Sequence, residues 1–182
     1  MPTYPELQEV QYYPHPEQFF RKIHAGMEIR SILDVGAGHG GVFDCGYWTN
    51  HPGVHTRVAC DIFKVRDIPF NWQVRNGVDA LELTSHFERR SFDLVQCTEV
   101  LEHIADSRRA LEQLCAVAKK LVFITSADET HHEGEPPARI QAITPAQAYV
   151  TQPAVADLLD LGFTVYKDNE RGRQLIAWKE IE

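Results

Sequence analysis

The residues best suited to chemistry form a strand-like run that ends in an acid and a series of glycines. The run is ILDVGAGHGG, from Ile32 to Gly41. Glycine allows positive backbone φ and brings N–H groups close to a ligand that any Cβ would push away. We therefore interpret the run as a nucleotide-binding turn between a strand and a helix. Its candidate ligand-contacting residues are Asp34, Gly36, Ala37, Gly38 and Gly40.

The glycine spacing alone leaves two kinds of nucleotide open. Gly36, Gly38 and Gly41 also fit the GxGxxG fingerprint, which would predict an NAD(P)-binding oxidoreductase. Asp34 favours a different ligand, because a carboxylate at the end of the strand disfavours a pyrophosphate and gives a charge-assisted hydrogen bond to an ammonium group. A second motif, SFDLVQCTEVLEHI from Ser91 to Ile104, combines a strand-like run with a polar loop and a turn that bears Glu and His.

With these two motifs the chain resembles the class I S-adenosylmethionine-dependent methyltransferases, most closely their small type 11/12 domains. The resemblance covers about residues 30 to 125 and implies S-adenosylmethionine as the cofactor. It implies that the glycine turn contacts the methionine moiety, that an acid after the second strand binds the ribose, and that residues after the third and fourth strands contact the adenine and face the methyl donor. The matching positions are Asp61, Ile62, Val78, Asp79, Thr98 and Glu99.

Two of these acids also have plain structural interpretations. Asp61 could cap a turn, although its place some twenty residues beyond the glycines suits a ribose ligand. Asp79 could equally be an acid at the start of a surface helix.

Methyl transfer from a sulfonium is an in-line displacement, so the protein must align a nucleophile and, for a hydroxyl or amine, help to remove its proton. The candidate bases are His103, His131 and His132, with Glu99 as an orienting carboxylate.

A metal-assisted alternative rests on Glu99, Glu102 and His103. Their ExxEH spacing is similar to that of small-RNA 3′-end 2′-O-methyltransferases, and on one helical face they could bind Mg²⁺ or Mn²⁺. The same letters occur in many metal-free relatives, so we expect no metal. A non-catalytic binding subunit would also keep this fold, but such a protein usually has eroded glycines.

Apolar strand runs alternate with helical patterns, which predicts a Rossmann-like α/β fold with helices on both faces of a mostly parallel seven-stranded sheet. The last two strands read as a hairpin, so the last should run antiparallel. Only about ten residues, including Pro69, separate the second and third strands, which predicts an irregular crossover without a helix. The expected strands are 31–35, 57–61, 72–75, 92–96, 121–125, 162–167 and 173–179, and the expected helices are 16–25, 40–48, 78–86, 106–118 and 153–161.

The 182 residues, 43% of them hydrophobic, suit a single domain over 1–182. The four cysteines lack CxxC spacing, and no signal-like or membrane-length apolar run is present, so we expect reduced thiols in a soluble, cytoplasmic protein. The net charge of −8 argues against a nucleic-acid partner and favours a small-molecule methyl acceptor. Residues 1–16 and 127–147 lie outside the expected core and are the candidate acceptor-binding segments.

Overall fold

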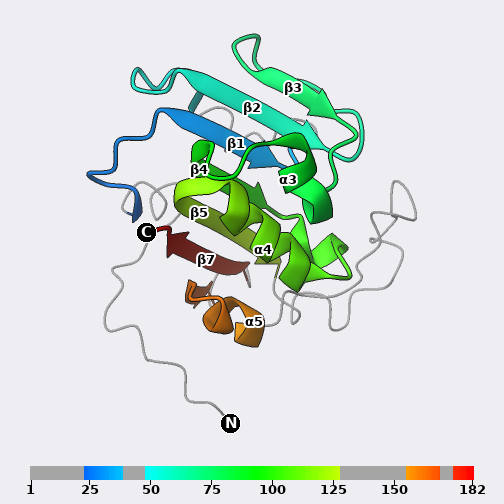
Figure 1. Ribbon diagram of the computed structural model, residues 1–182, viewed down its shortest axis with the longest axis vertical. Helices are drawn as coiled ribbons and strands as arrows, with labels where there is room; N and C mark the ends of the chain where they lie inside the picture. Colours follow the sequence, from blue (N-terminus) through cyan, green and yellow to red (C-terminus); the bar gives the residue numbers. More distant parts are fainter. Residues whose placement is uncertain (1–22, 39–47, 128–154, 169–173) are drawn as a thin grey trace.

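A computed structural model describes residues 23–38, 48–127, 155–168 and 174–182 (Figure 1). Seven strands form one sheet in the order β3-β2-β1-β4-β5-β7-β6. The predicted strands are confirmed, with ends that shift by a few residues. They are β1 (Ser31–Val35), β2 (Thr56–Asp61), β3 (Gln73–Asn76), β4 (Phe92–Thr98), β5 (Ala118–Ala127), β6 (Thr164–Asp168) and β7 (Gln174–Glu180).

The sheet is parallel except for its last strand. β1 to β5 pair in parallel, and β7 runs antiparallel to both of its neighbours, β5 and β6. The arrowheads of β1, β2 and β3 accordingly point the same way in Figure 1. Because β1 lies between β2 and β4, the strand order reverses at β1, and ligands of open α/β sheets bind at the carboxyl ends beside such a switch point.

Helices α3 (Leu83–His86), α4 (Ser107–Val117) and α5 (Val155–Asp160) contribute to the apolar cluster on one face of the sheet, and in Figure 1 α4 lies between α3 and α5. In α4, apolar residues three and four positions apart are buried against the sheet, and Asp106 caps the helix by accepting a bond from Arg109 N at 3.0 Å. The short elements are η1 (Ala80–Glu82), α3 (Leu83–His86), η2 (Leu101–His103), α4 (Ser107–Val117) and α5 (Val155–Asp160). Gly162, at φ +80°, ends α5 as the sequence predicts.

The opposite face has its own apolar cluster, in which Ile32, Leu94 and Phe123 of the sheet pack with Trp48 and Trp72. The helices expected over 16–25 and 40–48 lie outside the described residues except at their carboxyl ends. Residues 1–16, and 127–147 beyond Ala127, lie outside them as well.

The crossover from β2 to β3, residues 62–72, contains no helix, which confirms the irregular connection predicted around Pro69. Two hydrogen bonds fix its course. Val65 N donates to the side-chain Oδ1 of Asn76 at 2.8 Å, and Arg66 N donates to Gly38 O at 2.9 Å. The crossover is therefore bonded to both the end of β3 and the glycine turn.

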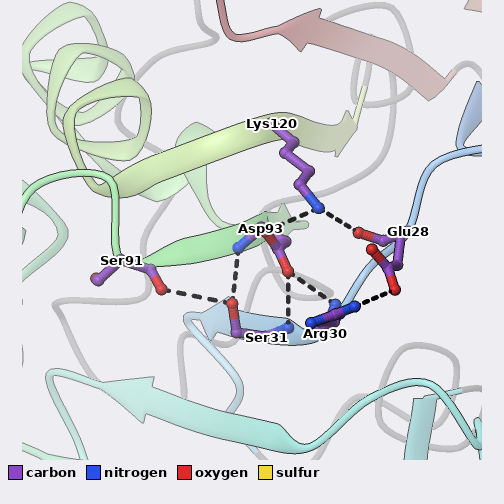
Figure 2. A network of polar contacts seen from close by, with 6 residues as sticks. All are labelled: Glu28, Arg30, Ser31, Ser91, Asp93 and Lys120. Carbon is purple, nitrogen blue, oxygen red and sulfur yellow. Dashed lines mark hydrogen bonds and ion pairs between the residues drawn. The ribbon is translucent and has the colours of Figure 1, made fainter.

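A polar network joins the amino ends of β1, β4 and β5 (Figure 2). Asp93 Oδ2 accepts from Arg30 N at 2.8 Å and Ser31 N at 3.3 Å, and its Oδ1 lies 3.1 Å from Lys120 Nζ. Desolvation opposes the ionisation of this buried carboxyl, but the bonds from Arg30 N and Lys120 outweigh it and lower the pKa of Asp93.

A β-bulge positions Lys120 for this contact. Phe92 pairs with Ala118, and Leu94 pairs with Leu121. Two steps along β4 therefore match three steps along β5, so β5 carries one extra residue there. β5 therefore begins directly after α4, and the helix expected to reach residue 118 ends at Val117 instead.

Cysteines in the described residues are free thiols. Cys60 and Cys97 are buried and Cys115 is half-buried, and burial raises the pKa of both Cys60 and Cys115. Cys45 lies outside the described residues. No helix within the described ranges is long and apolar enough to cross a bilayer.

Candidate functional site

The glycine turn follows β1 directly. Gly36 has φ +77° and Gly38 φ +52°, both in the left-handed region. The N–H groups of Gly36 and Ala37 donate to Cys60 O at 2.8 and 3.0 Å, which fastens the turn to the end of β2. Gly40 lies outside the described residues.

The two described glycines of the turn have different surroundings. A Cβ on Gly36 would overlap the methyl groups of Val100, in the loop after β4. Among the described residues, a Cβ on Gly38 would meet Gly36 O alone, at 3.8 Å. Packing against Val100 therefore requires a glycine at position 36, whereas no described side chain crowds Gly38.

Asp61, at the end of β2, is bonded to the turn. Its Oδ2 accepts from Gly38 N at 3.0 Å, and its Oδ1 accepts from Phe63 N at 2.7 Å. An ionised carboxylate has about four acceptor positions, and the described residues fill two of them. Asp61 thus fills the turn-capping role and stands where a ribose acid is expected.

The segment after β3 is tied to the same strand end. Val78 N donates to Asp61 O at 3.0 Å, and the Val78 side chain is buried. Asp79 Oδ1 accepts from Leu81 N at 2.8 Å and caps η1, so the helix-start interpretation of Asp79 holds. Ile62 is 54% exposed next to Asp61.

Asp34 is the buried acid of the site, only 2% exposed. Its register partners are Ala59 on β2 and Gln96 on β4. Burial raises the pKa of the Cys60 thiol, and the nearby carboxylates of Asp34 and Asp61 raise it further.

The loop after β4 begins with strained backbone. Glu99 has φ +54°, which is uncommon for a residue other than glycine and is often found at functional sites. Two contacts with β5 hold it: Glu99 N donates to Thr125 O, and Thr125 Oγ1 donates to Glu99 Oε1, both at 2.9 Å. The half-buried Thr98 ends β4 beside Thr125.

Glu99, Glu102 and His103, the residues of the metal-assisted alternative, do not share one helical face. η2 spans only Leu101–His103, and Glu99 precedes it in left-handed backbone. Glu102 is buried and accepts from Ser126 Oγ at 3.0 Å. The described part of the chain holds no group of three His, Cys, Asp or Glu residues that could bind a metal ion.

The structure thus gathers most of the predicted cofactor residues at the carboxyl ends of four neighbouring strands, β3, β2, β1 and β4. The half-buried His103 follows on η2, while His131 and His132 lie outside the described residues. One residue escaped the sequence analysis. Gln96 is a buried amide within β4, and the signal that could have found it is a lone polar residue inside the apolar run FDLVQC.

Comparison with solved structures places the fold among methyltransferases. The CurJ carbon methyltransferase is 14% identical over 90% of this chain and 52% of its own, with a TM-score of 0.62. A SAM-dependent methyltransferase from Aquifex aeolicus is 18% identical over 92% of this chain and 90% of its own, with a TM-score of 0.61. Magnesium protoporphyrin IX methyltransferase from Synechocystis PCC 6803, with bound SAH, is 15% identical over 90% of this chain and 80% of its own, with a TM-score of 0.58.

The chain spans about half of the CurJ protein, so the likeness to that protein concerns a part of it. No curated protein sequence matches the chain. A family model described as a methyltransferase domain matches residues 15–161. The chain therefore belongs to the methyltransferase-domain family.

Proposed function

We propose that this methyltransferase transfers the methyl group of S-adenosylmethionine to a small molecule or another compact polar acceptor. The contact between Asp61 and Gly38 carries the proposal, because it joins the acid after β2 to the glycine turn after β1. A left-handed glycine whose N–H is bonded to an acid at the end of the neighbouring strand suits a nucleoside.

The residues present fit the cofactor. Asp61 would bind the ribose hydroxyls, and the apolar side chains of Ile62 and Val78 would lie against the adenine. Asp34 would accept hydrogen bonds from the ammonium of the methionine moiety. When bound, S-adenosylmethionine supplies an electrophilic methyl group on a sulfonium.

The remaining tasks of the protein are to orient the acceptor and to take its proton. His103 stands just beyond the Glu99 loop and is a candidate base, together with His131 and His132. We assign acceptor binding to residues 1–16 and 127–147 of a single domain over 1–182. The net charge of −8 favours a small acceptor over a nucleic acid, because a nucleic acid is bound largely through Lys and Arg.

Calorimetric titration with S-adenosylhomocysteine tests the cofactor assignment. We expect low-micromolar binding to the parent. Asp34→Ala should lower the affinity about tenfold or more, because it removes a charged hydrogen bond of about 1.5–3 kcal/mol. Gly38→Val should lower it as strongly, because its side chain would occupy the place proposed for the ligand.

Matched controls separate ligand contacts from folding defects. Gly26→Val also places a branched residue in left-handed backbone, at φ +85°, where no described atom lies within 4 Å of the added Cβ, and Asp106→Ala removes a cap on α4. Both should bind like the parent. Binding of NAD without binding of S-adenosylhomocysteine would contradict the proposal and indicate an oxidoreductase. Binding without methyl transfer to any of a broad panel of acceptors would favour a non-catalytic subunit.

A further inference from the structure

A buried amide lies beside the candidate cofactor site. Gln96 is 0% exposed, and neither its Oε1 nor its Nε2 has a hydrogen-bond partner within the described part of the chain. A buried polar group without a partner loses its bonds to water and gains nothing in exchange. Such a group calls for a partner that the described residues do not provide.

The strand register places Gln96 next to Asp34. The two residues are partners across β1 and β4, so their side chains stand on the same face of the sheet. Beneath them on that face are Ile32 and Leu94, which belong to the apolar cluster. Gln96 and Asp34 are therefore neighbouring polar side chains on an otherwise apolar face, near the carboxyl ends of β4 and β1.

The chemistry of an amide narrows the choice of ligand. Gln96 offers one acceptor and one two-hydrogen donor, whereas the ionised Asp34 only accepts. A ligand group that carries an ammonium and a carboxylate would satisfy this pair: the ammonium would donate to Asp34 and to Gln96 Oε1, and the carboxylate would accept from Gln96 Nε2. The sheet order agrees, because Asp61 and Val78 occupy the nucleoside side at β2 and β3 and Gln96 lies on the other side of β1.

We infer that Gln96 binds the zwitterionic amino-acid end of the cofactor and so distinguishes S-adenosylmethionine from adenosine ligands that lack it. This inference rests on the proposed cofactor. Gln96 is a binding residue here and takes no part in proton transfer.

Two ligands and one variant test the inference by calorimetric titration, with thermal unfolding as a second readout. S-adenosylhomocysteine has the amino-acid end, and 5′-methylthioadenosine lacks it. Gln96→Met should lower the affinity for the first about tenfold or more and leave the affinity for the second within about twofold. Its melting temperature should stay the same or rise, because an apolar side chain of similar shape replaces a group without a partner.

Gln113→Met is the matched control, since Gln113 is an amide bonded to Thr84 through Oε1 at 2.9 and 3.0 Å on the other side of the sheet. It should melt earlier and bind both ligands like the parent. Should Gln96→Met fail to fold, Gln96→Glu keeps an acceptor but loses the donor and adds a charge beside Asp34. The same selective loss is then expected.

Each result decides one question. Equal loss for both ligands, or no loss for either, would overturn the role of Gln96. A lowered melting temperature with unchanged selectivity would assign Gln96 a structural bond instead. Failure of the parent to bind S-adenosylhomocysteine would overturn the cofactor proposal itself.

Discussion

Gly36 and Gly38 are both glycines of the turn motif, but their surroundings differ. Gly36 makes room for Val100 and so lets the loop after β4 approach the turn, while Gly38 N donates to Asp61 Oδ2. The two glycines thus differ in their contacts, and we expect substitutions at the two positions to have different consequences.

Gly36→Ala should lower the free energy of unfolding by about 2–4 kcal/mol, because it combines left-handed strain with overlap against Val100. Val100→Ala in the same chain should recover part of the loss. Gly26→Ala, strained but with nothing nearby, should lose only about 1–2 kcal/mol. Urea titration measures all three, and equal losses for Gly36→Ala and Gly26→Ala would remove the packing role.

At the scale of elements, the strands and their directions were predicted from apolar runs and turn residues. The buried central strands β1 and β4 leave a continuous hydrophobic signature, whereas β3 is exposed at all four positions. The crossover without a helix was predicted from its short length and from Pro69. The bulge in β5 and the left-handed Glu99 were not predictable, since both arise from contacts between strands distant in sequence. Lys120 lies just beyond the helix expected over 106–118, and nothing in the sequence indicates its ion pair with Asp93.

The network at the amino ends of the strands makes stability depend on pH. The folded-state pKa of Asp93 is lowered, so its contribution is complete above the unfolded pKa of about 3.9 and is lost as pH falls through the folded value. Asp93→Asn should cost about 1–3 kcal/mol at pH 7, and the difference from the parent should shrink below about pH 4. The exposed Glu88→Gln should change little at any pH, and a difference between parent and Asp93→Asn that does not vary with pH would contradict this account.

The separation of Glu99 from η2 predicts independence from metal ions. Treatment with EDTA should leave both the melting temperature and methyl transfer unchanged, because Thr125 and Ser126 already bond Glu99 and Glu102. Loss of activity with recovery on adding Mn²⁺ would instead support a metal site and an RNA 2′-hydroxyl acceptor.

On the scale of the whole molecule, the two faces of the sheet differ in what covers them. The described helices pack on one face, and the crossover of residues 62–72 with Trp72 contributes to the other. The crossover also exposes apolar side chains, with Phe70 at 99%. Neighbouring positions in this segment should therefore respond very differently to substitution.

Phe70→Ser should change the free energy of unfolding by no more than about 0.5 kcal/mol, whereas Trp72→Ala should cost about 3–5 kcal/mol. Trp72 is buried, and its Nε1 donates to Thr49 Oγ1 at 3.0 Å. Chemical denaturation of the two variants compares them directly, and a large loss for Phe70→Ser would show that this side chain packs in solution.

The crossover also gives the protein an intrinsic optical probe. Arg66 N holds the segment to Gly38 O, and the indole of Trp72 lies a few residues further along the same segment. Indole emission depends on local polarity and packing, so any adjustment of the glycine turn that reaches the crossover becomes visible as a change in fluorescence. A connection without a helix thus links the glycine turn to a chromophore, and we expect ligand binding at the turn to change the fluorescence of the unlabelled protein.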